Sequence, residues 1–140
     1  MQYVRNWTST PLDTNESYRE VEARTLLNAD NTTASSATVN GGFNITIKDV
    51  DKSGTEVVVR NLTITGEVAN YAVNRANNWH AGCPTSGQIT VEATLSVQVG
   101  DAAAAVSTWN FDVVMEDGQA TVTMTEGANQ VAYQRTVYSL

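Results

Sequence analysis

Residues 89–98 read ITVEATLSVQ, and this stretch alternates apolar and polar side chains without interruption. The apolar residues occupy every odd position, from Ile89 to Val97. Successive side chains of a β-strand point to opposite faces, so this period of two predicts a strand with one buried face and one wet face.

The C-terminal part of the chain repeats this pattern. The alternation recurs in three later stretches, which are 109–115, 120–125 and 131–137. Glu116-Asp117-Gly118 and the segment 126–129 separate these stretches, and glycine supplies the positive φ that tight hairpin turns require. Four strands with short connections predict an antiparallel meander.

The N-terminal part is less regular. Alternation predicts strands over 18–28 and 43–47, and the polar run ADNTTASSATVN at 29–40 predicts a loop between them. Val57 and Val59 have the opposite parity to Leu62 and Ile64, which predicts a bulge or a bend near Arg60-Asn61 within one long strand. The following stretch, EVANYAVNRA, fits either a short strand or one helical turn.

Composition agrees with an all-β protein. Of the 140 residues, 41% are hydrophobic and 16% are charged, which fits one β domain over 1–140. Strands that are apolar on one side must bury that side, so the expected fold is an antiparallel β-sandwich or flattened barrel with a C-terminal four-strand meander. Residues 1–17 are polar and suggest a flexible or exchanged N-terminal arm.

Charge and hydropathy exclude two classes of partner. The net charge is −7 and the few cations are scattered, whereas binding to nucleic acid requires clustered Lys and Arg. No apolar run approaches the ~18 residues that span a bilayer, so we expect no membrane insertion. Residues 1–20 also lack the apolar core of a signal peptide.

The segment Asp49-Val50-Asp51-Lys52-Ser53-Gly54 resembles the opening of a calcium-binding loop. Asp49, Asp51 and Ser53 would supply oxygen ligands at alternate positions, with glycine at the sixth. The twelfth position, where a bidentate Glu is needed, is Arg60. We therefore interpret the segment as a hairpin turn and keep calcium as the alternative.

His80 and Cys83 are the only histidine and cysteine, and both lie in NNWHAGCPTSG at 77–87. A zinc site needs three or four protein ligands, and a nucleophilic cysteine needs a base and an orienting group. No such partners are evident. Glycoside hydrolysis needs two carboxylates at a defined separation across a cleft, and we interpret the acidic residues of the strands and turns as surface residues instead. We expect no catalytic residues and no cofactor, and a structural junction at this segment.

Three tryptophans could contact a partner or a sugar. Trp109 shares the inward parity of Phe111 and Met115, which predicts a core position. Trp7 and Trp79 lie in less regular segments, so they are the candidate contact residues for a protein or a carbohydrate.

From Gly42 onward the order of short motifs resembles that of β-rich domains of bacterial secreted proteins and surface lipoproteins. These motifs are Ile64-Thr65-Gly66, Cys-Pro-Thr-Ser-Gly at 83–87, the strand ITV, a Trp-containing strand and the Asp117-Gly118 turn. The chain departs from that pattern because it lacks a lipobox cysteine near its start. The resemblance implies an extracellular or cell-envelope location and a structural or adhesive role, and it supplies no catalytic residues.

We therefore expect a non-enzymatic structural or adhesive module at a cell surface, including a self-assembling filament subunit. The alternative is a virion structural protein, such as a capsid, decoration or tail component. In both cases the expected partner is protein, through exposed edge strands or the N-terminal arm.

Overall fold

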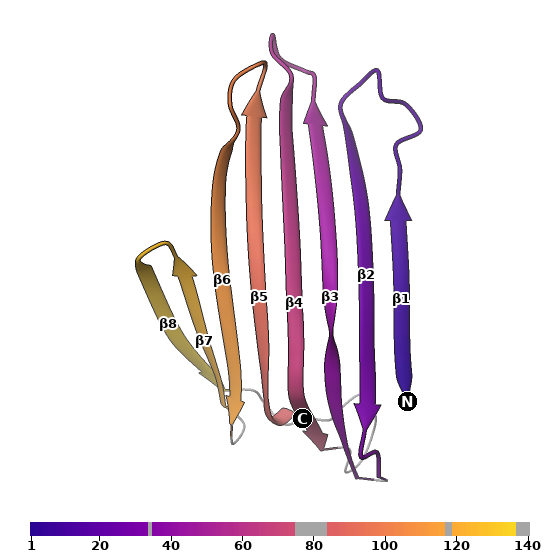
Figure 1. Ribbon diagram of the computed structural model, residues 1–140, viewed down its shortest axis with the longest axis vertical. Helices are drawn as coiled ribbons and strands as arrows, with labels where there is room; N and C mark the ends of the chain where they lie inside the picture. Colours follow the sequence, from indigo (N-terminus) through magenta and orange to yellow (C-terminus); the bar gives the residue numbers. More distant parts are fainter. Residues whose placement is uncertain (34, 75–83, 117–118, 137–140) are drawn as a thin grey trace.

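The described residues fold into eight strands that form one antiparallel sheet (Figure 1). The structure is a computed structural model and describes residues 1–33, 35–74, 84–116 and 119–136. Its strands are β1 (Gln2–Ser9), β2 (Tyr18–Asp30), β3 (Ser36–Asp51), β4 (Val58–Asn74), β5 (Pro84–Val99), β6 (Ala105–Glu116), β7 (Gln119–Glu126) and β8 (Asn129–Thr136). They lie side by side in chain order, which confirms the all-β class and the C-terminal meander.

The sheet is open, and within the described residues each strand contacts only its neighbours in the sheet. The described strands form one open layer in place of the expected sandwich or flattened barrel. They add no second layer, and β1 does not pair with β8. The physical reason is that alternation specifies which face of a strand is apolar. It does not specify whether the same chain provides the cover.

The register gives the sheet two chemically different faces, because residues paired across neighbouring strands share a face. What we call the apolar face comprises Val21, Ala23, Leu27, Phe43, Ile45, Ile47, Leu62, Ile64, Val68, Ile89, Val91, Ala93, Leu95, Trp109, Phe111, Val113, Met115, Ala120, Val122 and Met124. What we call the polar face comprises Glu20, Glu22, Arg24, Asn44, Thr46, Lys48, Asn61, Thr63, Thr65, Glu67, Gln88, Thr90, Glu92, Thr94, Thr108, Asn110, Asp112, Thr121, Thr123 and Thr125. Each strand thus places its alternate residues on opposite sides of a single layer.

Burial within the described chain is slight for an apolar surface of this extent. Among the residues whose burial is described, the buried hydrophobic ones are Ala37, Val50, Ala93 and Ala120, and none of the large side chains is fully buried. The bulky residues of the apolar face, including Ile64 and Trp109, are only half-buried by their lateral neighbours. A sheet covers the edges of its side chains but leaves their tips in water unless another layer packs on it.

One cross-strand contact fixes the register at the centre of the apolar face. Phe43 of β3 pairs with Gly66 of β4, and the Phe43 ring lies over the glycine where a Cβ would otherwise stand. An aromatic side chain that covers a glycine on the adjacent strand shields the exposed backbone. This pairing explains why Gly66 is buried although it lies in the middle of a long strand.

A bulge lies in β4 at residues 69–71, not at the predicted Arg60-Asn61. Asn70 has a φ of 50°, and its backbone N–H donates to Asn40 Oδ1 at 2.7 Å. From Val58 to Val68 the pairing with β3 continues without a shift. The prediction was wrong because Val59 belongs to the other side of the sheet, where it pairs with the buried Val50.

Three other segments differ in extent from the sequence expectation. The run 29–40 is mostly strand, since β2 continues to Asp30 and β3 starts at Ser36. The described part of 67–76 belongs to β4, which excludes the helical turn there. Within the suggested arm 1–17, residues 2–9 form β1 and pair with β2 of the same chain.

Candidate functional site

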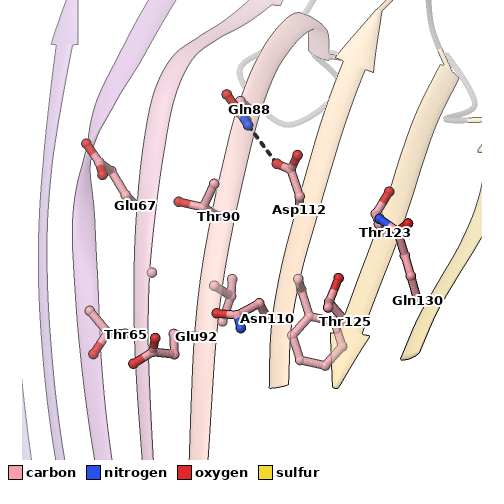
Figure 2. A pocket seen from close by; sticks show the side chains of 13 residues that line it. Thr65, Glu67, Gln88, Thr90, Glu92, Asn110, Asp112, Thr123, Thr125 and Gln130 are labelled. Carbon is pink, nitrogen blue, oxygen red and sulfur yellow. Dashed lines mark hydrogen bonds between the residues drawn. The ribbon is translucent and has the colours of Figure 1, made fainter. Parts of the chain in front are cut away.

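The largest described hollow lies on the polar face, over strands β4 to β8 (Figure 2). Its volume is about 750 Å³. The polar side chains that line it come from five neighbouring strands: Thr65, Glu67, Gln88, Thr90, Glu92, Asn110, Asp112, Thr123, Thr125 and Gln130. Neighbouring strands are about 4.8 Å apart, so these side chains form a regular array of hydrogen-bonding groups.

The polar groups of the hollow are hydroxyls, amides and carboxylates, and Gly66, Val91 and Phe111 complete its lining. Gln88 Nε2 donates to Asp112 Oδ1 at 2.7 Å, and Glu67 and Glu92 add two further carboxylates (Figure 2). None of its lining residues is His, Cys, Lys or Arg. This arrangement can donate and accept hydrogen bonds with a polyhydroxylated ligand, and its charge favours a neutral or cationic one.

Sequence reasoning assigned these residues to the solvent side of their strands but did not identify the hollow. Their alternation with the apolar residues gave the correct face. The hollow additionally depends on how β7 and β8 incline relative to the longer strands (Figure 1). Periodicity within one strand contains no information on that inclination.

In the calcium candidate, Asp49 is engaged in an ion pair. Arg19 of β2 donates two hydrogen bonds to it, from Nε to Oδ1 at 2.5 Å and from Nη2 to Oδ2 at 2.9 Å. The hydrogen bond from Arg19 lowers the pKa of the Asp49 carboxyl, and the charges of Arg19 and Arg60 act in the same direction. The carboxylate therefore faces a fixed guanidinium on the neighbouring strand.

Asp51 and Ser53 of the same candidate are joined by the hydrogen bonds of a tight turn. The backbone N–H of Ser53 donates to Asp51 Oδ1 at 3.0 Å, and Ser53 Oγ donates to the same oxygen at 2.6 Å. Ser17 Oγ adds a third hydrogen bond at 3.3 Å. The bonds from Ser53 lower the pKa of Asp51. Among the described residues, no three His, Cys, Asp or Glu side chains gather closely enough to hold a metal ion.

We expect calcium to give no saturable heat in isothermal titration calorimetry with this protein. Asp49 would have to leave Arg19, and Asp51 would have to leave Ser53, before either could coordinate a cation. A saturable heat that Asp49→Asn and Asp51→Asn both remove would contradict this expectation and support the calcium alternative.

The Arg19–Asp49 pair makes a prediction about pH. Because the folded-state pKa of Asp49 is lowered, the pair stabilises the fold above the unfolded-state pKa of about 4, and this contribution disappears as the pH falls through the lowered folded-state value. In Arg19→Gln, the pKa of Asp49 should rise towards its ordinary range in a carboxyl ¹³C NMR titration. Arg24→Gln is the matched control, since Arg24 lies on the opposite face of β2. An unchanged Asp49 titration in Arg19→Gln would show that the pair does not form in solution.

The two tryptophans predicted as contact residues have different outcomes. Trp7 is on the edge strand β1, paired with Ala23, and 49% of its surface is exposed. Together with Arg5 and Thr25 it lines a hollow of about 170 Å³ on the same side as the apolar face. Trp79 lies outside the described residues, as do His80, Cys83 and the Asp117-Gly118 turn. Trp109 shares the apolar face, as its parity predicts.

The apolar face is the second candidate surface. A folded monomer of this size exposes about 7,100 Å². The chain exposes 9476 Å² over both faces of the sheet and its loops, which is about 2,400 Å² more than that expectation. Contiguous exposed apolar surface of more than a few hundred Å² marks interaction sites in monomeric proteins.

Comparison of the chain with family models, curated proteins and solved structures finds no match. The described part of the chain contains no helix with the length and apolar character needed to cross a bilayer. Function must therefore be inferred from the two faces of the sheet.

Proposed function

We propose that this chain is a non-enzymatic structural module that works by binding other copies of itself. The observation that carries the proposal is the apolar face, which the described strands leave without a second layer. Burial of apolar surface is the dominant favourable contribution to most protein association, and it is roughly proportional to the area removed from water.

The polar face supports the structural part of the proposal. Its hollow is lined mainly by hydroxyls, amides and carboxylates on five neighbouring strands. Cross-strand hydrogen bonds already engage several of the polar groups, such as Asn44 Nδ2 with Thr65 Oγ1 at 3.1 Å and Thr94 with Thr108 at 3.1 Å. These contacts stabilise a regular surface that water can cover.

The edges of the sheet offer a second way to associate. β1 and β8 are the outermost strands, and each pairs with one neighbour in the described structure. The open side of an edge strand can add a strand from another molecule through backbone hydrogen bonds. Edge pairing would extend an assembly laterally and so supports a filament subunit, while the apolar face accounts for pairing between layers.

An extracellular or cell-envelope location is part of the proposal and is supported by the sequence resemblance alone. The alternative is a structural component of a virion, for which the same self-associating sheet would serve equally well. Immunogold labelling distinguishes the two: label on the surface of intact cells supports the first, and label on purified particles supports the second.

Carbohydrate contact is a second candidate function, favoured by the hydroxyl-rich hollow on the polar face. Titration of ¹⁵N-labelled protein with neutral oligosaccharides tests it. Saturable amide shifts confined to residues such as Thr90 and Asp112 would support this function, and unchanged spectra at millimolar sugar would exclude it.

Sedimentation velocity over a wide concentration range tests the leading proposal. We expect at least twice the mass of the chain at micromolar concentration, with dissociation on dilution. A strict monomer at the highest attainable concentration would contradict self-association through either the face or the edges.

A further inference from the structure

We propose that a second copy of this chain covers the apolar face, related to the first by a two-fold axis parallel to the strands. The inference rests on the proposed self-association and specifies its geometry. The two copies together would form the β-sandwich whose second layer the described strands do not supply. Aligned sheets in sandwiches pack about 10 Å apart, with interdigitated side chains.

The exposed area fits a face-to-face pair. A standard protein interface buries about 800 Å² on each partner, and obligate homodimers bury more and are more apolar. The chain exposes 9476 Å², roughly 2,400 Å² beyond what a compact monomer of this size exposes. A single-layer sheet exposes this excess on both faces, and half of it would still exceed the area that one partner buries in a standard interface.

Three charged residues of the described strands lie on this side of the sheet at its lateral margins: Arg5, Glu126 and Arg135. Arg5 of β1 pairs with Thr25, and Glu126 of β7 pairs with Trp109, so both share the side of the apolar face. Arg5 and Glu126 stand at opposite sides of the sheet (Figure 1).

The register across the sheet places Arg5 level with Met124, which is two residues from Glu126 along β7. Arg5 and Glu126 are therefore offset by about 7 Å along the strand direction. Arg135 of β8 pairs with Ala120 and is four residues from Val131, which lies at the level of Arg5, so Arg135 is about 13 Å from that level along the strand direction.

The symmetry axis follows from these charges. A two-fold axis parallel to the strands reverses the order of the strands and leaves each residue's position along the strand direction unchanged. In this arrangement β1 lies over β7 and β8 of the second copy. Arg5 then approaches the partner's Glu126, and the contact occurs twice because the interface is isologous. An axis perpendicular to the strands would instead place β1 over β1 and bring the two strands that carry Arg5 together. Charge complementarity selects the first arrangement.

A second charged group lies on this side of the sheet where β2 and β4 begin and β3 ends, and its charges allow a second copy to stack there. Arg19, Asp49 and Arg60 pair across β2, β3 and β4, with Asp51 one rung further along β3. These four side chains carry two charges of each sign. A parallel axis places this end over the same end of the partner, so the stacked ends have no net charge to repel them.

A charge-reversal cycle tests the arrangement. Arg5→Glu and Glu126→Arg should each raise the dimer dissociation constant about 10-fold or more, which is about 1.4 kcal/mol. The double variant should restore it to within about 3-fold of the original value. Arg24→Glu is the control, because it makes the same change on the polar face of β2 and should leave association unchanged. Both test residues are exposed, and circular dichroism verifies that each variant keeps its sheet.

The outcomes separate the two proposals. A monomeric wild-type protein would overturn the proposed function. A wild-type dimer in which the double variant is as weak as the single variants, or in which no variant changes association, would overturn the parallel-axis arrangement and leave self-association standing.

Discussion

The Ile64→Asp variant is expected to lose self-association almost completely. Ile64 lies at the centre of the apolar face, between Ile45 of β3 and Ala93 of β5. Burying an isoleucine side chain contributes about 1.5–3 kcal/mol, and a symmetric pair contains two of them. An unpaired aspartate at the same position adds a desolvation cost. We expect the dissociation constant to rise at least about 100-fold, measured by sedimentation velocity.

Thr63→Asp is the matched control for this variant. Thr63 is the preceding residue of the same strand and belongs to the polar face, where it pairs with Thr46 and Thr94. The charge is the same and the backbone position is shifted by one residue, so only the face differs. Equal losses of association in the two variants would mean that the apolar face is not the interface.

The Gly41→Ala variant is expected to destabilise the fold by about 3 kcal/mol, combining an unfavourable φ with a steric overlap. Gly41 has a φ of 147°, which L-residues with a side chain rarely adopt. A Cβ at this position would also lie 2.9 Å from Leu27 Cα and overlap the Leu26 carbonyl oxygen, both of which are backbone atoms of β2. Urea unfolding at fixed protein concentration measures the change in the free energy of unfolding.

Gly54→Ala serves as the comparison. Gly54 is in the turn after β3, and the nearest atom to an added Cβ is the Glu56 carbonyl oxygen at 3.7 Å. We expect a change within about 0.5 kcal/mol, as for other surface substitutions without a special conformation. If Gly41→Ala were equally mild, the φ of Gly41 and its close approach to the backbone of β2 would not exist in solution.

The sequence predicted the regular strands well because their chemistry is local. The stretch 89–98 lies within β5, and the later alternating stretches correspond to β6, β7 and β8. Alternation is strict in the stretch 89–98 and is kept on the inward positions of the later strands, and period two follows from the geometry of an extended chain. The same rule placed Trp109 on the apolar face.

The errors occurred where local pattern and tertiary pairing disagree. The segment 29–40 is rich in Asp, Asn, Ser and Thr, which favour loops, yet its two ends pair as strands with each other and with their neighbours. The bulge was expected near Arg60 because Val59 was assigned to the apolar face. In the structure Val59 pairs with the buried Val50 on the other side of the sheet. Which side a residue buries depends on its neighbours across the sheet.

The sequence alone could not decide whether the segment 49–54 is a calcium site or a hairpin turn. Oxygen ligands at alternate positions suggested calcium, whereas the structure shows the Arg19 pair and the Ser53 turn bonds that those letters also permit. Arg19 is distant from Asp49 in the chain, so no local motif could reveal their contact. The polar hollow and the uncovered apolar face likewise arise from pairing and sheet shape.

Isotope-filtered NMR on a mixture of ¹³C-labelled and unlabelled protein detects directly whether a second copy covers the apolar face. We expect intermolecular NOEs from the methyl groups of Ile45, Leu62 and Ile64, and none from those of Thr63 and Thr90 on the polar face. Intermolecular NOEs from the threonine methyls in place of the isoleucine and leucine methyls would contradict the account.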